Sequence, residues 1–149
     1  MTNIASKDLT KVAPRSAYET INGFAILARA IDKGRATIAG TNGDYNFDCP
    51  VDNMILNFVG IKGEELRAKL EAGATDEEIG TWVKEASKKS DEEIKAWSES
   101  FKSDFSYAHH PDAGKQAWFR GECERLGLNA DTTTLFDYLD VDDKATFAN

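Results

Sequence analysis

The chain lacks most of the features that mark a common function class. Its 149 residues include two cysteines, Cys49 and Cys123, without C-x-x-C spacing, and no phosphate-binding glycine loop or nucleophile-elbow motif. No apolar run approaches the roughly 20 residues that cross a bilayer, and the N-terminus has no apolar signal core. We therefore expect a cytoplasmic protein with reduced thiols and no membrane partner.

Positive charge is also scarce. Eighteen Lys and Arg residues face 26 Asp and Glu residues, which gives a net charge of −8. Residues 1–60 carry six charges of each sign, so residues 61–149 supply the whole excess. An acidic surface repels nucleic-acid phosphates and anionic lipid headgroups. We expect no nucleic-acid partner and no docking on membranes.

The residues that are present favour a folded, mainly α chain. Hydrophobic residues make up 41% of the sequence and only three prolines interrupt it, so a core can bury roughly two-thirds of the unfolded surface. Apolar residues recur at helical spacing from about Ala17 to Ile31. We predict a single compact helical domain spanning 1–149, with residues 1–16 as an extended arm and 141–149 as a frayed acidic tail.

The segment 36–49 has two interpretations. Asn42-Gly43 is a strong turn signal, and Tyr45, Phe47 and Cys49 alternate like a short strand, which is typical of a β-hairpin near residues 36–49. The alternative, which we favour slightly, continues the preceding helix to about Ala39.

Later segments carry clear helix boundaries. Asp52 and Gly60 bracket a short apolar run as N-cap and C-cap. T-D-E-E-I-G-T-W begins at Thr75 and S-D-E-E-I-K-A-W begins at Ser90, each with the Ser/Thr and Glu spacing of a capping box. Two copies are too few for a solenoid. We predict two consecutive capped helices, followed by a helix over Asp112–Leu126 and a shorter one beginning at Leu135.

The candidate site lies between Arg29 and Asp52, where a helix acquires charges and a turn supplies a thiol. On a helical projection Arg29 and Lys33 fall on the far side from the apolar residues, Asp32 lies at the border and Arg35 projects among them. Three interpretations stay open for Arg35: an ion pair with Asp32, a guanidinium that binds an anion, or a solvated side chain beyond a helix that ends earlier. The leading hypothesis is a binding site for a small anionic ligand, formed by Arg29, Asp32, Arg35, Tyr45, Cys49 and Asp52.

Two other function classes compete with ligand binding. In the first, Cys49 is the nucleophile of a thiol-dependent enzyme and His109 or His110 is its base. A helix N-terminus near Cys49 favours a thiolate, whereas Asp48 and Asp52 oppose one.

In the second, the helices that carry Trp82 and Trp97 form a dimerisation or protein-interaction face, so the chain is a monomer or a homodimer.

The pair His109 and His110 with Asp112 lacks recognised ligand spacing, so we predict no metal site and no cofactor.

Several segments resemble the bacterial domain of unknown function 5069 family. They are K-D-L-T at Lys7, P-R-S at Pro14, G-F-A-I-L-A-R-A-I-D-K-G-R-A at Gly23, G-D-Y-N-F-D-C-P-V-D at Gly43 and F-V-G-I at Phe58. The resemblance implies a small soluble bacterial protein of about this length and no particular activity. The family pattern often has His where this chain has Asn46, and that departure weakens a proposal of acid–base chemistry there.

Overall fold

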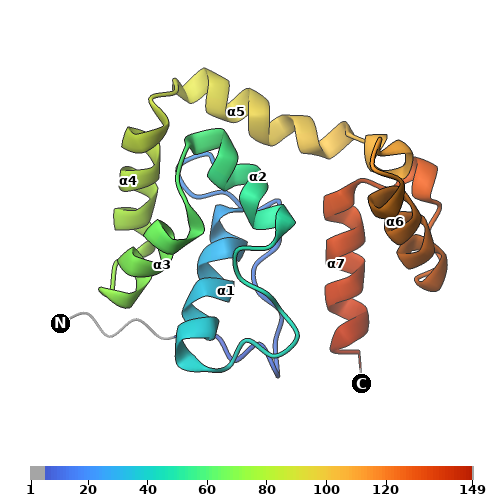
Figure 1. The fold of residues 1–149 in the computed structure, drawn as a ribbon, viewed down its shortest axis with the longest axis horizontal. Coiled ribbons are helices and arrows are strands. Elements are labelled where there is room, and N and C mark those ends of the chain that lie inside the picture. The colour runs from blue at the N-terminus through green and yellow to red at the C-terminus, as the bar shows by residue number, and fades with distance from the viewer. Residues whose placement is uncertain (1–5, 149) are drawn as a thin grey trace. The chain divides into compact units, whose positions relative to one another are not determined.

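The computed structural model describes residues 6–148, and these form an all-helical chain (Figure 1). The α-helices among them are α1 (Leu27–Ala39), α2 (Pro50–Val59), α3 (Gly63–Glu71), α4 (Asp76–Ser87), α5 (Asp91–Ser100), α6 (Ala113–Arg125) and α7 (Leu135–Thr146). Three short 3-10 helices are η1 (Phe101–Ser103), η2 (Ser106–His109) and η3 (Ala130–Thr132). The described residues contain no strand, only an isolated bridge between Ile21 and Phe24. The prediction of a mainly α fold is confirmed.

The hairpin considered for residues 36–49 does not form. Helix α1 continues to Ala39 and ends at Gly40, whose φ of 77° is the left-handed conformation that glycine adopts easily. The next residue, Thr41, bonds away from the loop: its carbonyl accepts the Leu9 amide at 2.8 Å, and its hydroxyl reaches the Lys7 carbonyl at 3.3 Å. The backbone carbonyl of Thr41 therefore pairs with the N-terminal segment and not with a second hairpin strand.

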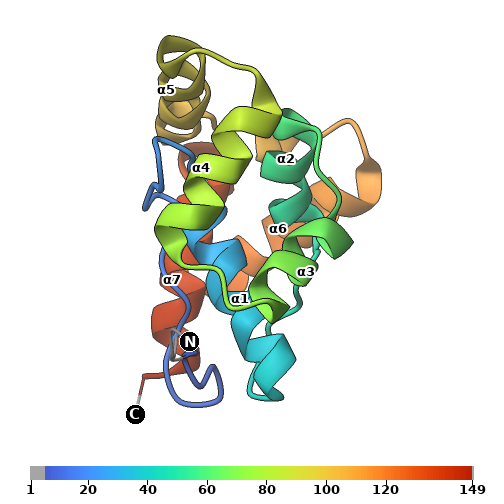
Figure 2. The ribbon, with the colours of Figure 1, turned by 90° about the vertical axis from the view of Figure 1, so that its left-hand side faces the viewer.

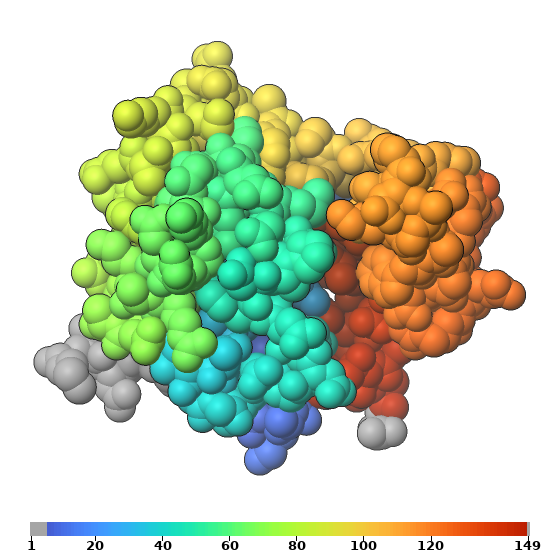
Figure 3. All heavy atoms as spheres, in the orientation of Figure 1, coloured from blue at the N-terminus to red at the C-terminus, as the bar shows by residue number. Residues whose placement is uncertain are grey.

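Contacts within the chain group it into two units, Met1–Lys95 and Ala96–Asn149. The expectation of a single domain stays a prediction. In the first unit α1 contacts α2 and α3, and α2 contacts α4. Figure 2 shows α3 and α4 on the viewer's side of α1. In the space-filling view of Figure 3, atoms of the cyan and green segment from about residue 40 to residue 70 cover much of α1.

Helix α1 begins ten residues later than the spacing predicts. Asn22, Gly23 and Ile26 all have positive φ, so the backbone before Leu27 turns instead of coiling. Ile26, with φ 73°, is a β-branched residue in a conformation that such residues rarely adopt. Its amide donates to the carbonyl of Ala17 at 2.8 Å, and its side chain is fully buried. Tertiary packing therefore holds a strained entry to the helix.

The ends of the chain differ from expectation in one respect. Residues 6–16 contain no helix, as an arm requires, but Leu9 and Pro14 are buried; residues 1–5 of the predicted arm lie outside the described residues. The frayed tail is wrong, because α7 runs to Thr146. Thr134 caps that helix, and Asp142 pairs with Arg125 at 2.8 Å, which ties the segment to α6.

The two predicted capping boxes are present. Thr75 accepts the Glu78 amide at 3.1 Å, and Ser90 accepts the Glu93 amide at 3.1 Å, while each glutamate returns a bond to the capping residue's amide. In the second unit an aromatic core forms around stacked Phe101 and Phe136 rings 4.4 Å apart. No helix among residues 6–148 combines the length and apolarity that a membrane span needs.

Candidate functional site

Helix α1 carries three buried charged side chains within five residues. Arg29, Asp32 and Lys33 are 4%, 5% and 3% exposed, although the helical projection placed Arg29 and Lys33 in solvent. That expectation is wrong because segments distant in sequence cover the polar side of α1: Arg29 donates to the carbonyl of Arg15 at 3.4 Å, and Lys33 reaches the turn before α2. Buried charges need partners, so each contact of these side chains matters.

Asp32 is bound by Arg15 rather than by Arg35. The two oxygens of Asp32 accept the Arg15 amide at 2.8 Å and its Nε and Nη2 at 3.1 Å each, and Lys7 Nζ lies 3.7 Å away. A two-pronged guanidinium–carboxylate contact of this kind is strong and directional. The predicted Asp32–Arg35 ion pair is therefore replaced by one that fixes the N-terminal segment on α1.

Arg35 is held by α4. Its Nη1 lies 2.9 Å from Asp76 Oδ1 and its Nη2 donates to the carbonyl of Ala74 at 3.1 Å. Asp76 also accepts Arg15 Nη1 at 2.9 Å, so one carboxylate joins two arginines. Burial opposes the charged form of Asp76, but the hydrogen bond and charge of Arg15, together with Arg35, outweigh it and lower the pKa of Asp76 below its ordinary value.

A second cluster joins α1 to α2. Lys33 Nζ lies 2.9 Å from Asp52 Oδ1 and donates to Cys49 Sγ at 3.1 Å. We call Lys33, Cys49 and Asp52 the thiol cluster. The side chain of Lys33 is 4% exposed and that of Asp52 is 0% exposed, whereas Cys49 is half-buried. A cation that the sequence appeared to leave in solvent therefore contacts the sulfur.

Local structure presents Cys49 to Lys33. Cys49 is the N-cap of α2 and Pro50 is its first helical residue, so the expectation that Asp52 is the N-cap is corrected. Asp52 instead accepts the amide of Asp48 at 2.9 Å, which closes the turn that carries Cys49. Asn53 donates to the carbonyls of Asp48 and Cys49 at 3.1 and 3.0 Å. The sulfur is consequently held at the start of a helix by backbone and side-chain bonds.

The electrostatics of the thiol cluster are mixed. The ammonium of Lys33 and the positive end of α2 both stabilise negative charge on sulfur. Asp52 offsets part of the ammonium charge, and its Oδ1 makes a close ion contact with Lys33 without the alignment of a hydrogen bond. The arrangement places a half-buried thiol beside a buried amine and a buried carboxylate. It can support nucleophilic chemistry at sulfur.

Tyr45 belongs to the arginine side of the site. The Arg29 guanidinium lies 5.6 Å from the centre of the Tyr45 ring, a cation–π distance. We call the linked side chains of Lys7, Arg15, Arg29, Asp32, Arg35, Tyr45 and Asp76 the arginine network. The six predicted site residues fall into two groups. Arg29, Asp32, Arg35 and Tyr45 belong to the arginine network, and Cys49 and Asp52 belong to the thiol cluster. Sequence reasoning missed Lys7, Arg15, Lys33 and Asp76 as members. The P-R-S segment was the one available signal for Arg15.

The histidines take part in contacts of the second unit. His109 Nε2 lies 3.1 Å from Asp131, and Arg120 approaches His109 Nδ1 at 3.3 Å. Cys49 belongs to the first unit, so a histidine base for it stays a prediction. Among residues 6–148, no group of three or more His, Cys, Asp or Glu side chains is placed to hold a metal ion.

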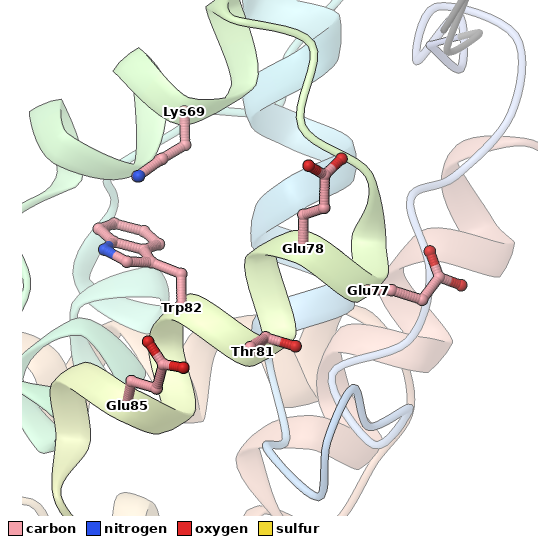
Figure 4. Close-up of a pocket in the computed structure, with 6 residues that line it drawn as sticks. All are labelled: Lys69, Glu77, Glu78, Thr81, Trp82 and Glu85. Atoms are coloured by element: carbon pink, nitrogen blue, oxygen red, sulfur yellow. The ribbon is translucent and has the colours of Figure 1, made fainter.

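A shallow groove of about 440 Å³ lies over α4, and none of the predicted site residues lines it (Figure 4). The ammonium of Lys69 on α3 stands 5.2 Å from the centre of the Trp82 ring and occupies its face. The remaining polar lining comes from Thr81 and three glutamates, Glu77, Glu78 and Glu85. This acidic lining does not suit the anionic ligand that the sequence suggested.

Comparison with known families assigns the chain. The model of the family described as domain of unknown function (DUF5069) matches residues 11–145. The chain belongs to the DUF5069 family. The match covers the thiol cluster and the arginine network except Lys7, and it confirms the resemblance drawn from the sequence segments. No curated protein matches the chain.

Proposed function

We propose that this DUF5069 chain is a thiol-dependent protein in which Cys49 acts as a nucleophile toward a small electrophilic substrate. The observation that carries the proposal is the contact of 3.1 Å between Lys33 Nζ and Cys49 Sγ, made by a lysine that is 3% exposed. A desolvated ammonium beside sulfur stabilises the negative charge on which thiol reactivity depends. In this proposal Lys33 acts as a cation that stabilises the thiolate, a different role from the base that the sequence analysis assigned to a histidine.

The surroundings of Cys49 support this role. The sulfur stands at the N-terminus of α2, where a helix favours negative charge. Cys49 is half-buried, so a small molecule can reach it, whereas Cys123 is fully buried. Burial, with the nearby charge of Glu122, raises the pKa of the Cys123 thiol. The two cysteines are thus a reactive candidate and an internal reference in one chain.

Alkylation of the native protein tests the proposal. At pH 7 iodoacetamide is expected to modify Cys49 faster in the folded chain than in the same chain unfolded in urea, because folding supplies Lys33 and the helix terminus. The variant Cys123→Ser removes the second thiol and makes Cys49 the sole reporter. A folded chain whose Cys49 reacts more slowly than its unfolded form contradicts the proposal.

The variant carrying both Lys33→Met and Asp52→Leu replaces the buried pair with apolar side chains, which proteins often tolerate. It is expected to keep the fold and lose the rate advantage of Cys49. Circular dichroism checks the fold, and alkylation in the Cys123→Ser background measures the rate. A double variant that alkylates as fast as the parent shows that Lys33 does not activate the thiol.

A second candidate function is the binding of a small anion by the arginine network. Lys7, Arg15, Arg29 and Arg35 supply four cationic groups around the two carboxylates of Asp32 and Asp76. Guanidinium groups gathered in this way suit the geometry of a planar or tetrahedral anion. Asp32 and Asp76 already engage Arg15, and Asp76 and the Ala74 carbonyl already engage Arg35.

Thermal unfolding with and without inorganic phosphate tests anion binding. Binding to the folded chain raises the midpoint in proportion to the logarithm of ligand concentration above the dissociation constant. Arg29→Gln is expected to reduce that rise, and Arg67→Gln, on the exposed side of α3, is the matched control. Phosphate that raises the midpoint equally in the parent and in Arg29→Gln, and no more than sodium chloride does, argues against a site here.

The predicted dimerisation through Trp82 and Trp97 stays a third alternative. Light scattering measures the oligomeric state.

A further inference from the structure

The thiol cluster brings two different nucleophiles together. Lys33 Nζ and Cys49 Sγ are 3.1 Å apart, which is hydrogen-bonding distance for a nitrogen and a sulfur. Lys33 is fixed on α1 and Cys49 is the N-cap residue of α2, so each group is anchored to a helix. Asp52 Oδ1 lies 2.9 Å from the same nitrogen and can take up its proton. An electrophile formed on sulfur therefore meets an amine at once.

We propose that Cys49 and Lys33 form a covalent sulfur–nitrogen bond when a hydroperoxide oxidises Cys49. The inference rests on the proposed function, because the first step is the reaction of a nucleophilic Cys49 with peroxide. The cross-link makes the site a reversible redox switch: the S–N bond removes the thiol from use and protects it from further oxidation. Sulfenic acids are known to condense with backbone nitrogen, and here an amine side chain is nearer.

The chemistry balances in two steps. The Cys49 sulfur attacks one oxygen of hydrogen peroxide, the O–O bond breaks, and the sulfur becomes a sulfenic acid while the other oxygen leaves as water. The sulfur is oxidised by two electrons and the peroxide is reduced by two. Lys33 Nζ, having passed a proton to Asp52, then attacks the sulfur; the S–N bond forms, the S–O bond breaks, and a second water leaves. One proton is released overall from the lysine ammonium.

Burial explains why the amine wins over competing partners. Lys33 is 3% exposed, so its nitrogen stays beside the sulfur rather than sampling solvent. Cys49 is half-buried, which admits a peroxide molecule but hinders a second protein thiol. A second peroxide is the remaining competitor for the sulfenic acid, and it must diffuse in from solvent. The neighbouring amine has the advantage of proximity.

Mass spectrometry of the full-length Cys123→Ser chain tests the inference, because that background excludes an internal disulfide. After treatment with hydrogen peroxide, the intact mass is expected to fall by two hydrogen atoms. Trypsin digestion is expected to yield one species joining the Lys33 and Cys49 peptides, with cleavage after Lys33 blocked. Dithiothreitol is expected to restore the original mass and the free thiol.

The same samples distinguish failure of the inference from failure of the proposed function. One outcome contradicts the cross-link alone. The chain then alkylates rapidly at Cys49, but peroxide adds either one oxygen, as a sulfenic acid that dimedone traps, or two oxygens irreversibly. A chain that alkylates slowly and resists peroxide contradicts both. The variant with Lys33→Met and Asp52→Leu is the matched control: it is expected to accumulate the oxygen adducts, and a loss of two hydrogens there would contradict the assignment to Lys33.

Discussion

Removing Lys33 alone is expected to destabilise the chain strongly. Lys33→Met takes away the ammonium 2.9 Å from Asp52 Oδ1 and leaves a carboxylate with 0% side-chain exposure without its counter-charge. Loss of one partner of a buried ion pair costs about 3–5 kcal/mol in unfolding free energy, because the remaining charge stays desolvated. This cost is a large fraction of the stability of a typical domain.

The double variant shows how much of the lost stability comes from leaving one charge of the pair buried without its partner. Replacing Lys33 with Met and Asp52 with Leu together removes both charges, so we expect a loss of no more than about 1–2 kcal/mol. The double variant is then expected to be more stable than Lys33→Met alone by about 1–4 kcal/mol. Lys84→Met is the matched control, since Lys84 pairs with Asp91 on the surface of the same unit and is expected to cost under about 1 kcal/mol.

Urea unfolding followed by circular dichroism measures these free energies, with tryptophan fluorescence as a second probe for coincident transitions. A loss below about 1 kcal/mol for Lys33→Met, equal to that of Lys84→Met, would refute the account of Lys33 as a buried partner of Asp52. A double variant less stable than Lys33→Met would refute the reasoning about the uncompensated carboxylate.

Two further predictions concern the framework of the site. Asp76→Asn is expected to cost about 1–2 kcal/mol at pH 7, because it removes the shared charge between Arg15 and Arg35 at a partly exposed position. The folded-state pKa of Asp76 is lowered, so its contribution is present above the ordinary value of 3.8 and is lost as pH falls through the lower folded value. The difference between parent and Asp76→Asn in urea midpoints should therefore shrink as pH falls below 3.8; a constant difference contradicts this. Gly63→Ala is expected to lower the thermal midpoint and slow Cys49 alkylation, because an added Cβ overlaps the Asp48 carboxylate. Gly121→Ala on α6 is the matched control, since its Cβ enters open space and its backbone has no positive φ. Unchanged alkylation kinetics for Gly63→Ala would contradict the link.

Local signals predicted much of the fold. The capping boxes at Thr75 and Ser90 and the left-handed glycine at Gly60 depend on a few adjacent residues, and those helix ends lie where the sequence places them. The start of α1 was missed because Ile26 takes a strained φ that only tertiary packing enforces. The end of α7 was missed, and the contact of Asp142 with Arg125, 17 residues away, is not visible in the local sequence.

The candidate site was located correctly in sequence but not in its pairings. Helical projection treats one side of α1 as solvent, and it has no means to show that the turn before α2 covers that side. The contact of Lys33 with Cys49 depends on this long-range packing, as does the contact of Arg35 with Asp76. Residue types and neighbourhood were predictable from the sequence; which charge meets which was set by the tertiary fold.

The rate of Cys49 alkylation tests the central claim most directly. In the Cys123→Ser chain at pH 7, the proposal predicts that folding speeds the reaction with iodoacetamide and that replacing Lys33 and Asp52 with Met and Leu abolishes this gain. A folded parent chain that reacts no faster than its unfolded form would contradict the claim that Lys33 activates the thiol.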